Sequence, residues 1–163
     1  MNDILYSPWR LDYINSRKEK GCVFCLDHPE DDDEQHLILY RGEFSFVIMN
    51  MYPYNNGHLM VVPNRHTNSI LSLSDAERDE LFKLVQSTVK IIKDSYHPEG
   101  MNIGMNIGKA AGAGIDEHIH VHIVPRWSGD VNFMTSIAAT RVIPEKFENV
   151  YQRLKEQFDK LHV

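Results

Sequence analysis

The chain has 163 residues, a length that suits one domain and that buries roughly 70% of the surface of the unfolded form. Hydrophobic residues make up 42% of it and charged residues 25%, and no apolar run approaches the ~20 residues needed to span a bilayer. The N-terminus lacks the pattern of a secretion signal, so we expect a cytoplasmic protein with reduced cysteines and no membrane partner. The net charge of −6 argues against a nucleic-acid polymer as partner, but not against a small anionic ligand.

The first half of the chain predicts an arm followed by strands. Residues 1–21 form the N-terminal arm, in which the aromatic and basic run Tyr6 to Lys20 predicts a short helix or a packed segment. Two β-rich runs, His36 to Tyr40 and Phe44 to Met49, are close enough to form a hairpin. A third strand, His58 to Val62, ends at a proline. The simplest arrangement is a meander of three antiparallel strands.

Two segments have the spacing of amphipathic helices. The first begins after Ser74, where a Ser-x-x-Glu sequence is typical of a capping box, and it ends near His97. The second is the C-terminal helix, residues 144–163, in which Pro144 suits the first turn and one apolar stripe follows.

Two further strands are predicted between these helices. Met101 to Ile107 is the fourth strand, Gly108 to Gly114 is a loop rich in glycine and alanine, and Asp116 to Trp127 is the fifth strand. The element order β-β-β-α-β-β-α predicts an α+β fold with an antiparallel sheet of about five strands and two main helices. The absence of repeats and low-complexity linkers predicts a single domain over residues 1–163.

The fifth predicted strand carries three alternating histidines. In an extended strand His118, His120 and His122 share one face, about 6.5–7 Å apart, and the aliphatic residues between them share the other. One interpretation is a metal tripod that holds a hydrolytic zinc with an open site. Another uses one imidazole as nucleophile, one as a donor to phosphate and one as support. A third interpretation is that the histidines have no functional role. The presence of three histidines within five residues, next to a glycine-rich loop, disfavours this interpretation.

Cys22 and Cys25 form a Cys-x-x-Cys pair and are the chain's two cysteines. Such a pair in a reducing compartment is half a metal site, a thiol–disulfide centre or packed thiols. Thioredoxin-like centres need a βαβ context, whereas this pair lies between a basic arm and an acidic loop. His66 and His118 could complete a tetrahedral zinc site of two cysteines and two histidines.

Several motifs together resemble the histidine-triad family of nucleotide hydrolases and transferases. His118-Ile-His-Val-His-Ile-Val124 is similar to the motif that defines the family. Further counterparts are Cys22-Val-Phe-Cys25, Phe46-Val-Ile-Met-Asn50, Gly57-His-Leu-Met-Val-Val-Pro63 and Asn106-Ile-Gly108. The Ser7-Pro-Trp-Arg10 arm and the segment Pro125 to Phe133 are similar to the branch of bacterial diadenosine tetraphosphate phosphorylases and hydrolases.

The resemblance implies an enzyme that cleaves dinucleoside polyphosphates at the α-phosphate. His120 would be the nucleophile that becomes a nucleotidyl-histidine, and His122 would hydrogen-bond the phosphate or the bridging oxygen of the leaving group. A structural Zn²⁺ is implied too, because four protein ligands leave no open position for water. Its ligands would be Cys22, Cys25, His66 and His118.

The resemblance also implies contacts with the nucleotide. Asn50 would bind ribose hydroxyls, although an asparagine that caps a strand end is the alternative. Asn106 and the main chain of Gly108 to Gly114 would contact phosphate, unless that loop is only a turn. Trp127 would stack on a base or pack at a subunit interface. Family members are typically homodimers with one continuous sheet, which the resemblance implies here as well.

By the same resemblance, the acceptor that releases the nucleotide depends on the residue just before the triad, which is Gly114 or, with a different loop alignment, Gly112 or Ala113. Hydrolases of the family usually carry a glutamine there, whose amide can orient water, whereas glycine leaves space and an accessible N–H that could admit inorganic phosphate. The sequence therefore favours phosphorolysis over hydrolysis. Two other functions remain open, namely nucleoside phosphoramidate hydrolysis and a non-catalytic role in binding a nucleotide or a partner protein.

Overall fold

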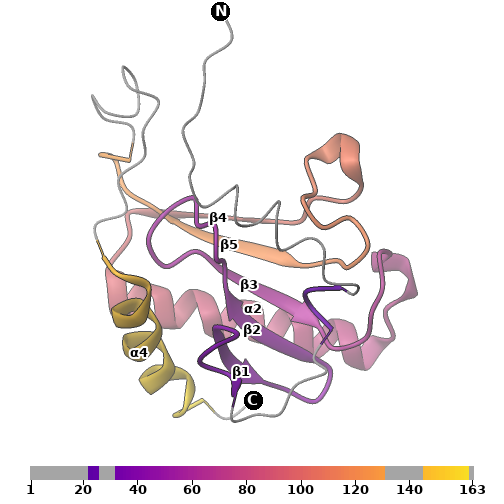
Figure 1. Cartoon of the computed structure of the whole chain (residues 1–163), viewed down its shortest axis with the longest axis horizontal. Helices are drawn as coiled ribbons and strands as arrows, with labels where there is room; N and C mark the ends of the chain where they lie inside the picture. Colours follow the sequence, from indigo (N-terminus) through magenta and orange to yellow (C-terminus); the bar gives the residue numbers. More distant parts are fainter. Residues whose placement is uncertain (1–21, 26–31, 131–144, 162–163) are drawn as a thin grey trace, which may run out of the picture.

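The computed structural model describes residues 22–25, 32–130 and 145–161, so the predicted arm and Pro144 lie outside the described residues. Five antiparallel strands form one sheet in the order β1-β2-β3-β5-β4, and two α-helices pack on it (Figure 1). This is the predicted α+β architecture. The strands are β1 (Ile38–Arg41), β2 (Ser45–Met49), β3 (Leu59–Pro63), β4 (Gly100–Gly104) and β5 (Val121–Arg126). The helices are α2 (Asp75–Tyr96) and α4 (Phe147–Phe158), with single 3-10 turns at η2 (Ile70–Ser72) and η3 (Lys109–Ala111).

The predicted meander is confirmed, with boundaries shifted by one or two residues. β1 pairs with β2, and β2 pairs with β3 in a regular register in which Phe46 faces Val62. β1 begins at Ile38 rather than at the predicted His36. The preceding residue, Leu37, has a φ of 61°, which belongs to a turn and not to a strand.

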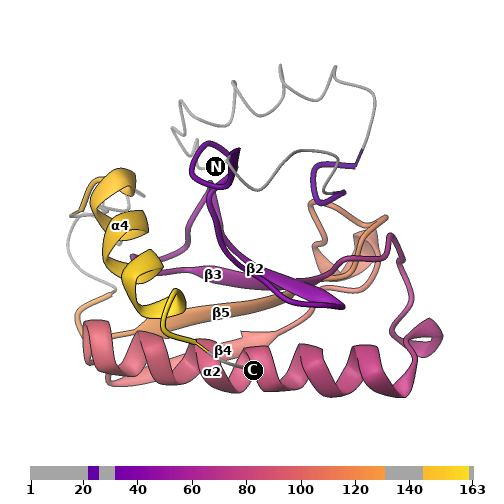
Figure 2. The same ribbon diagram turned by 90° about the horizontal axis from the view of Figure 1, so that it is seen from below.

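Helix α2 is formed as the sequence predicts. The Ser74 hydroxyl accepts from the Glu77 N–H, and the Glu77 carboxylate accepts from the Ser74 N–H, which completes the capping box. His97 ends the helix in a left-handed conformation just before Pro98. Figure 2 shows α2 running along one face of the sheet, where its buried side, including Leu84 and Ile92, packs against β2, β3 and β5.

Helix α4 is shorter than predicted. It begins at Phe147, with Lys146 at the N-cap position, and ends at Phe158, whereas the prediction ran from residue 144 to residue 163. The predicted apolar stripe is buried against β1 and α2. The Tyr151 hydroxyl also donates to the carbonyl oxygen of Ile38 over 3.0 Å, which fastens α4 to the edge strand β1.

Strands β4 and β5 are also shorter than predicted. β4 ends at Gly104, opposite His122, and β5 begins at Val121, so His118 and His120 precede the strand. The Ile119 N–H donates to the Thr67 carbonyl instead of joining the sheet. The predicted alternation is nevertheless kept, since Ile119, Val121 and Ile123 all belong to the core beneath the sheet.

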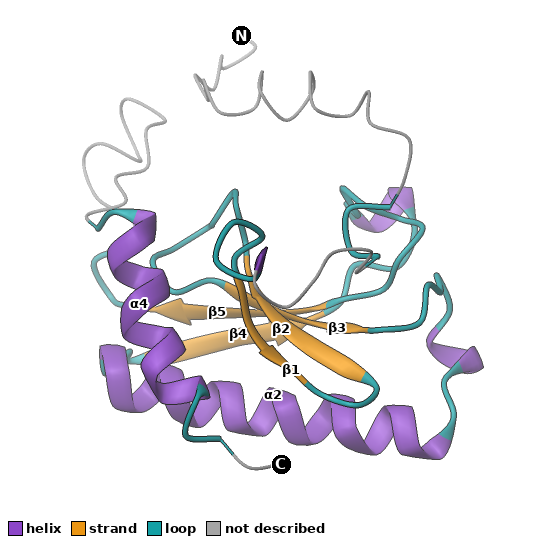
Figure 3. Cartoon of the chain, turned by 60° about the horizontal axis from the view of Figure 1, so that its bottom comes forward, coloured by secondary structure: helices purple, strands orange, loops and turns teal. Residues whose placement is uncertain are grey.

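The sheet has two different faces (Figure 3). Val47, Val61 and Ile123 face the main core, which α2 and α4 complete. The opposite face carries a second, smaller apolar cluster, made by Phe24, Ile38, Phe46, Met60 and Val62. The candidate site lies beside this smaller cluster. Within the residues described here, neither helix is both long and apolar enough to cross a membrane.

Candidate functional site

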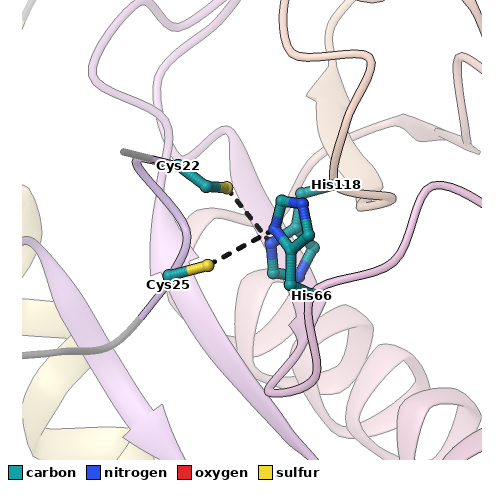
Figure 4. Close-up of side chains that lie close together, drawn as sticks. All are labelled: Cys22, Cys25, His66 and His118. Atoms are coloured by element: carbon teal, nitrogen blue, oxygen red, sulfur yellow. Dashed lines mark hydrogen bonds between the residues drawn. The ribbon is translucent and has the colours of Figure 1, made fainter. Parts of the chain in front are cut away.

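Four predicted metal ligands come together in the structure. The ligand atoms of Cys22, Cys25, His66 and His118 all lie within 4.8 Å of one another (Figure 4). Cys22 Sγ lies 3.3 Å from His118 Nδ1, and Cys25 Sγ lies 3.4 Å from His66 Nδ1. Zinc–sulfur and zinc–nitrogen bonds of about 2.3 and 2.0 Å place neighbouring tetrahedral ligands roughly 3.5 Å apart, so these spacings suit one zinc ion.

The hydrogen bonding of His118 also suits a metal. Its Nε2–H donates to the Pro63 carbonyl over 2.8 Å, which leaves the lone pair on Nδ1, next to the thiols. Burial of the ring lowers the pKa of His118, so that the imidazole is neutral at pH 7, the form that binds metals. Among the residues described, this is the one cluster with a metal-binding arrangement. It disfavours a tripod of the three alternating histidines, because His118 belongs to the thiol cluster.

His120 is held by the segment that carries His118. Its Nδ1–H donates to the main-chain carbonyl of His118 over 2.9 Å. The ring is 5% exposed, and burial lowers the pKa of His120, so that the neutral form dominates at pH 7. A neutral imidazole with its proton on Nδ1 has a free lone pair on Nε2. His120 is therefore in the tautomer that a nucleophile requires.

His122 has the opposite tautomer because of a fourth histidine, His58. The Tyr54 N–H donates to His58 Nδ1 over 3.1 Å, so the proton of His58 is on Nε2. That Nε2–H donates to His122 Nδ1 over 3.0 Å, which leaves the proton of neutral His122 on its own Nε2. Burial and the neighbouring histidines lower the pKa of His58 to about 3 and that of His122 to about 4.

His120 and His122 therefore form a complementary pair. Their ring centroids are 4.7 Å apart and the rings are nearly perpendicular, at 77°. His120 presents a lone pair on its Nε2, and His122 presents an N–H on its Nε2. Such a pair can attack a phosphorus atom and at the same time donate a hydrogen bond to an oxygen of the same phosphate.

His58 is a site residue that the sequence analysis did not assign. It precedes β3, and Met60 of that strand faces His122 in the register with β5. Residues 58 and 60 share a face, which brings His58 to His122. The signal in the sequence was a histidine directly before the apolar run Leu-Met-Val-Val. In the structure His58 is only 2% exposed, and a polar side chain buried to that extent needs a hydrogen-bond partner.

The predicted nucleotide contacts lie on the loops around this face. Asn50 follows β2, and its side-chain oxygen accepts from the Tyr52 N–H over 2.9 Å, as the turn interpretation predicts. Its amide nitrogen also lies 3.4 Å from both ring nitrogens of His58. Asn106, Gly108 and Gly114 lie on the β4–β5 connection, where Gly108 has a φ of 80°.

Trp127 directly follows β5 and is half-buried. Its N–H donates to the Asp130 carboxylate over 3.2 Å, and the same carboxylate oxygen accepts from Asn55 Nδ2 over 2.6 Å. These two hydrogen bonds join the turn after β5 to the β2–β3 loop that carries Asn50. They hold the main chain at Trp127 next to the β2–β3 loop.

Comparison with known proteins gives a consistent result. Residues 32–129 match the HIT domain. The chain is 37% identical over 163 residues to AP-4-A phosphorylase of Mycobacterium tuberculosis, covering 94% of this chain and 83% of that protein. It is 32% identical over 93 residues to bis(5'-adenosyl)-triphosphatase of Saccharomyces cerevisiae, covering 55% and 44%. A zinc-bound histidine triad family protein from Mycobacterium smegmatis superposes with a TM-score of 0.65 at 28% identity, covering 86% and 94%.

Proposed function

Because the chain belongs to the HIT domain family, we propose that it is an enzyme that cleaves dinucleoside polyphosphates at the α-phosphate through a nucleotidyl-His120 intermediate. The observation that carries this proposal is the complementary pair of tautomers, His120 with a lone pair on Nε2 and His122 with an N–H. The names of the phosphorylase and triphosphatase relatives support the substrate class.

The proposed reaction has two displacements at the α-phosphorus. In the first, His120 Nε2 forms a bond to phosphorus while the bond to the bridging oxygen breaks, and a nucleoside polyphosphate leaves. The His122 Nε2–H donates to a phosphate oxygen or to that bridging oxygen. In the second, an oxygen of the acceptor displaces His120 and releases the nucleotide. Both imidazoles begin neutral at pH 7, since burial lowers their pKa values.

Inorganic phosphate is the proposed acceptor. The phosphorylase relative matches this chain over most of its length, which supports phosphate rather than water. Gly114, in the predicted acceptor position, has no side chain that could orient a water molecule. Asn50 is the proposed ribose contact, and Asn106 with Gly108 the proposed phosphate contact.

Product analysis with diadenosine tetraphosphate tests this proposal. The protein should form ADP and ATP only when inorganic phosphate is present, whereas AMP and ATP formed at equal rates with and without phosphate would establish hydrolysis. His120→Ala should bind the nucleotide but lose several orders of magnitude in turnover, because the ground-state contacts remain when the nucleophile is removed. Turnover near that of the wild type would contradict the role of His120.

We also propose that the ion at the thiol–imidazole cluster is a structural zinc. The four side chains fill a tetrahedral set of ligands, so the metal would supply cross-linking and not an activated water. The zinc-bound relative supports the identity of the metal. Reduced thiols at this position fit the expected cytoplasmic location.

A homodimer with a continuous sheet is the proposed assembly. β4 is the last strand in the sheet order, and four of its five residues are exposed. Beside it an apolar groove of about 270 Å³ is lined by residues including Phe82 and Ile103, which are 64% and 49% exposed. A second copy would cover this groove and pair with β4. Ile103→Lys should give monomers in sedimentation analysis, whereas Gln35→Lys, near the opposite edge, should leave the dimer intact.

A further inference from the structure

Phe24 lies between two metal ligands and packs against the proposed nucleophile. It is the third residue of Cys22-Val-Phe-Cys25 and is 3% exposed. Its ring centroid lies 4.9 Å from that of His120, with the planes tilted by 51°, and 5.7 Å from that of His118 in an edge-on arrangement. One aromatic side chain therefore contacts both the ligand histidine and the catalytic histidine.

The hydrogen bond at Nδ1 does not by itself fix the His120 ring. That bond to the His118 carbonyl holds one atom, and the ring can still tilt about the contact. Tilting would move Nε2, which has to reach the α-phosphorus. An error of about 1 Å in the position of a reacting group can lower a rate about 100-fold, so a packed neighbour that prevents tilting affects catalysis.

The position of Phe24 depends in turn on the two cysteines. The Cys25 N–H donates to the Cys22 carbonyl over 3.1 Å, which makes the segment a tight turn with Phe24 inside it. The thiol of Cys22 contacts the imidazole of His118, and the thiol of Cys25 contacts that of His66. Val23, by contrast, is 64% exposed. The thiol side chains thus anchor the turn, and Phe24 is the side chain that it presents to the histidines.

We propose that Phe24 is a positioning residue for His120, and that the metal ligands Cys22 and Cys25 hold Phe24 in place. The inference rests on the role of His120 proposed above. It assigns the metal cluster a second task besides stability, since the cluster fixes the geometry of a nucleophile that is not itself a metal ligand.

Three variants of the full-length, zinc-loaded protein test the first half of the proposal. Phe24→Leu keeps an apolar side chain without the ring, Phe24→Tyr keeps the ring, and Val23→Ala changes the exposed neighbour. Phe24→Leu should lower kcat for diadenosine tetraphosphate about tenfold with KM changed less than about twofold, while Phe24→Tyr retains most of kcat and Val23→Ala all of it. Zinc content should be equal in all three.

NMR provides a readout that does not depend on turnover. The Cε1–H resonance of His120, identified by its loss in His120→Ala, should shift in Phe24→Leu because the neighbouring aromatic ring is gone. An unchanged resonance together with an unchanged kcat would overturn the proposal. If Phe24→Leu fails to fold, Phe24→Met, which also lacks the ring but fills a similar apolar volume, takes its place with the same expected shift of the resonance and the same expected loss of kcat. A shift without any activity in the wild type would show that the proposed function, and not the packing, is wrong.

Removal of zinc tests the second half. A chelator should move the His120 resonance of the wild type toward its position in Phe24→Leu and lower kcat by a similar factor. In Phe24→Leu the chelator should change the His120 resonance and kcat much less, because the aromatic contact with His120 is already absent. Equal effects of the chelator on the two proteins would show that the metal acts on His120 by another route, and would overturn the assignment of Cys22 and Cys25.

Discussion

Two histidines two positions apart take different tautomers because their Nδ1 atoms meet different partners. His120 Nδ1 faces a carbonyl and must donate, whereas His122 Nδ1 faces the Nε2–H of His58 and must accept. The proposed division of labour between nucleophile and donor therefore depends on the groups that face the two Nδ1 atoms. Main-chain groups set it in both cases, the His118 carbonyl directly and the Tyr54 N–H through His58.

The low pKa of His58 gives a measurable dependence of stability on pH. Its folded pKa of about 3 lies below the 6.5 of the unfolded chain, so between these values the unfolded state binds one more proton than the folded state. Stability should therefore fall as the pH falls below 6.5, with His58 contributing about 1.4 kcal/mol per pH unit.

Urea unfolding at a series of pH values from 7.5 to about 4.5 checks this contribution. His58→Asn should be less stable at neutral pH but lose stability more gradually on acidification. Leu71→Ala, which removes no titratable group at a position that is 93% exposed, should keep the wild-type slope. Equal slopes for His58→Asn and the wild type would show that His58 is not buried in the neutral form.

At the residue scale the sequence predicted the four side chains of the thiol–imidazole cluster, but not the hydrogen bond that His122 receives from His58. Thiols and imidazoles have few roles in this pattern, so Cys22, Cys25, His66 and His118 could be grouped before any coordinates. His58 could not, because its role depends on the register between β3 and β5, which strand alternation alone does not define.

At the scale of elements, hydrogen bonds link the start of α2 to the residue before His66 of the thiol–imidazole cluster. Glu77 of the capping box also accepts from Arg65, over 2.7 and 3.0 Å, and Arg65 immediately precedes the ligand His66. These hydrogen bonds lower the pKa of Glu77 to about 2, so the carboxylate stays charged over the working range of pH. The helix terminus therefore holds the backbone next to His66, a proposed metal ligand.

Loss of the cap should weaken the whole fold moderately. Ser74→Ala removes the acceptor of the Glu77 N–H, and a lost cap costs about 1 kcal/mol in free energy of unfolding. Lys83→Ala, at an exposed position inside the same helix, should stay within about 0.5 kcal/mol of the wild type. Denaturant unfolding of the two variants makes the comparison. A Ser74→Ala protein as stable as Lys83→Ala would show that the cap is redundant.

Local signals predicted α2 and the β1–β3 meander because capping, periodicity and short turns act within a few residues. The limits of β4 and β5 were wrong because pairing decides them. β4 ends opposite His122, and the residues that follow leave the sheet toward the η3 turn although their composition suits a strand. The start of α4 at Phe147 likewise depends on packing against β1 and α2, which periodicity cannot locate.

At the scale of the whole molecule, the thiol–imidazole cluster brings together segments that are distant in sequence. Cys22 and His118 are 96 positions apart, and Cys25 and His66 are 41 apart. A shared ion would cross-link the segment before the meander, the chain after β3 and the approach to β5. Structural zinc sites of this type supply roughly 10–16 kcal/mol of apparent binding free energy, so part of the stability should depend on the metal.

Metal analysis and thermal unfolding test this dependence. The purified protein should contain about one zinc per chain, and a chelator should lower its Tm by about 5–10 °C if roughly 3 kcal/mol of the binding energy stabilises the fold. Cys25→Ser should start from a lower Tm and respond little to the chelator, while Val23→Ala should behave as the wild type. A zinc-free protein with an unchanged Tm would instead show that the cluster is simply packed.

The central claim is that two displacements occur at one phosphorus atom, with His120 carrying the nucleotide between them. Each in-line displacement inverts the configuration at phosphorus, so two of them restore it. The most direct measurement is therefore the stereochemical course with a diadenosine tetraphosphate analogue that has one sulfur of defined configuration on the α-phosphorus. The account predicts retention of configuration in the nucleotide product, whereas inversion would mean direct attack by the acceptor and would contradict a nucleotidyl-His120 intermediate.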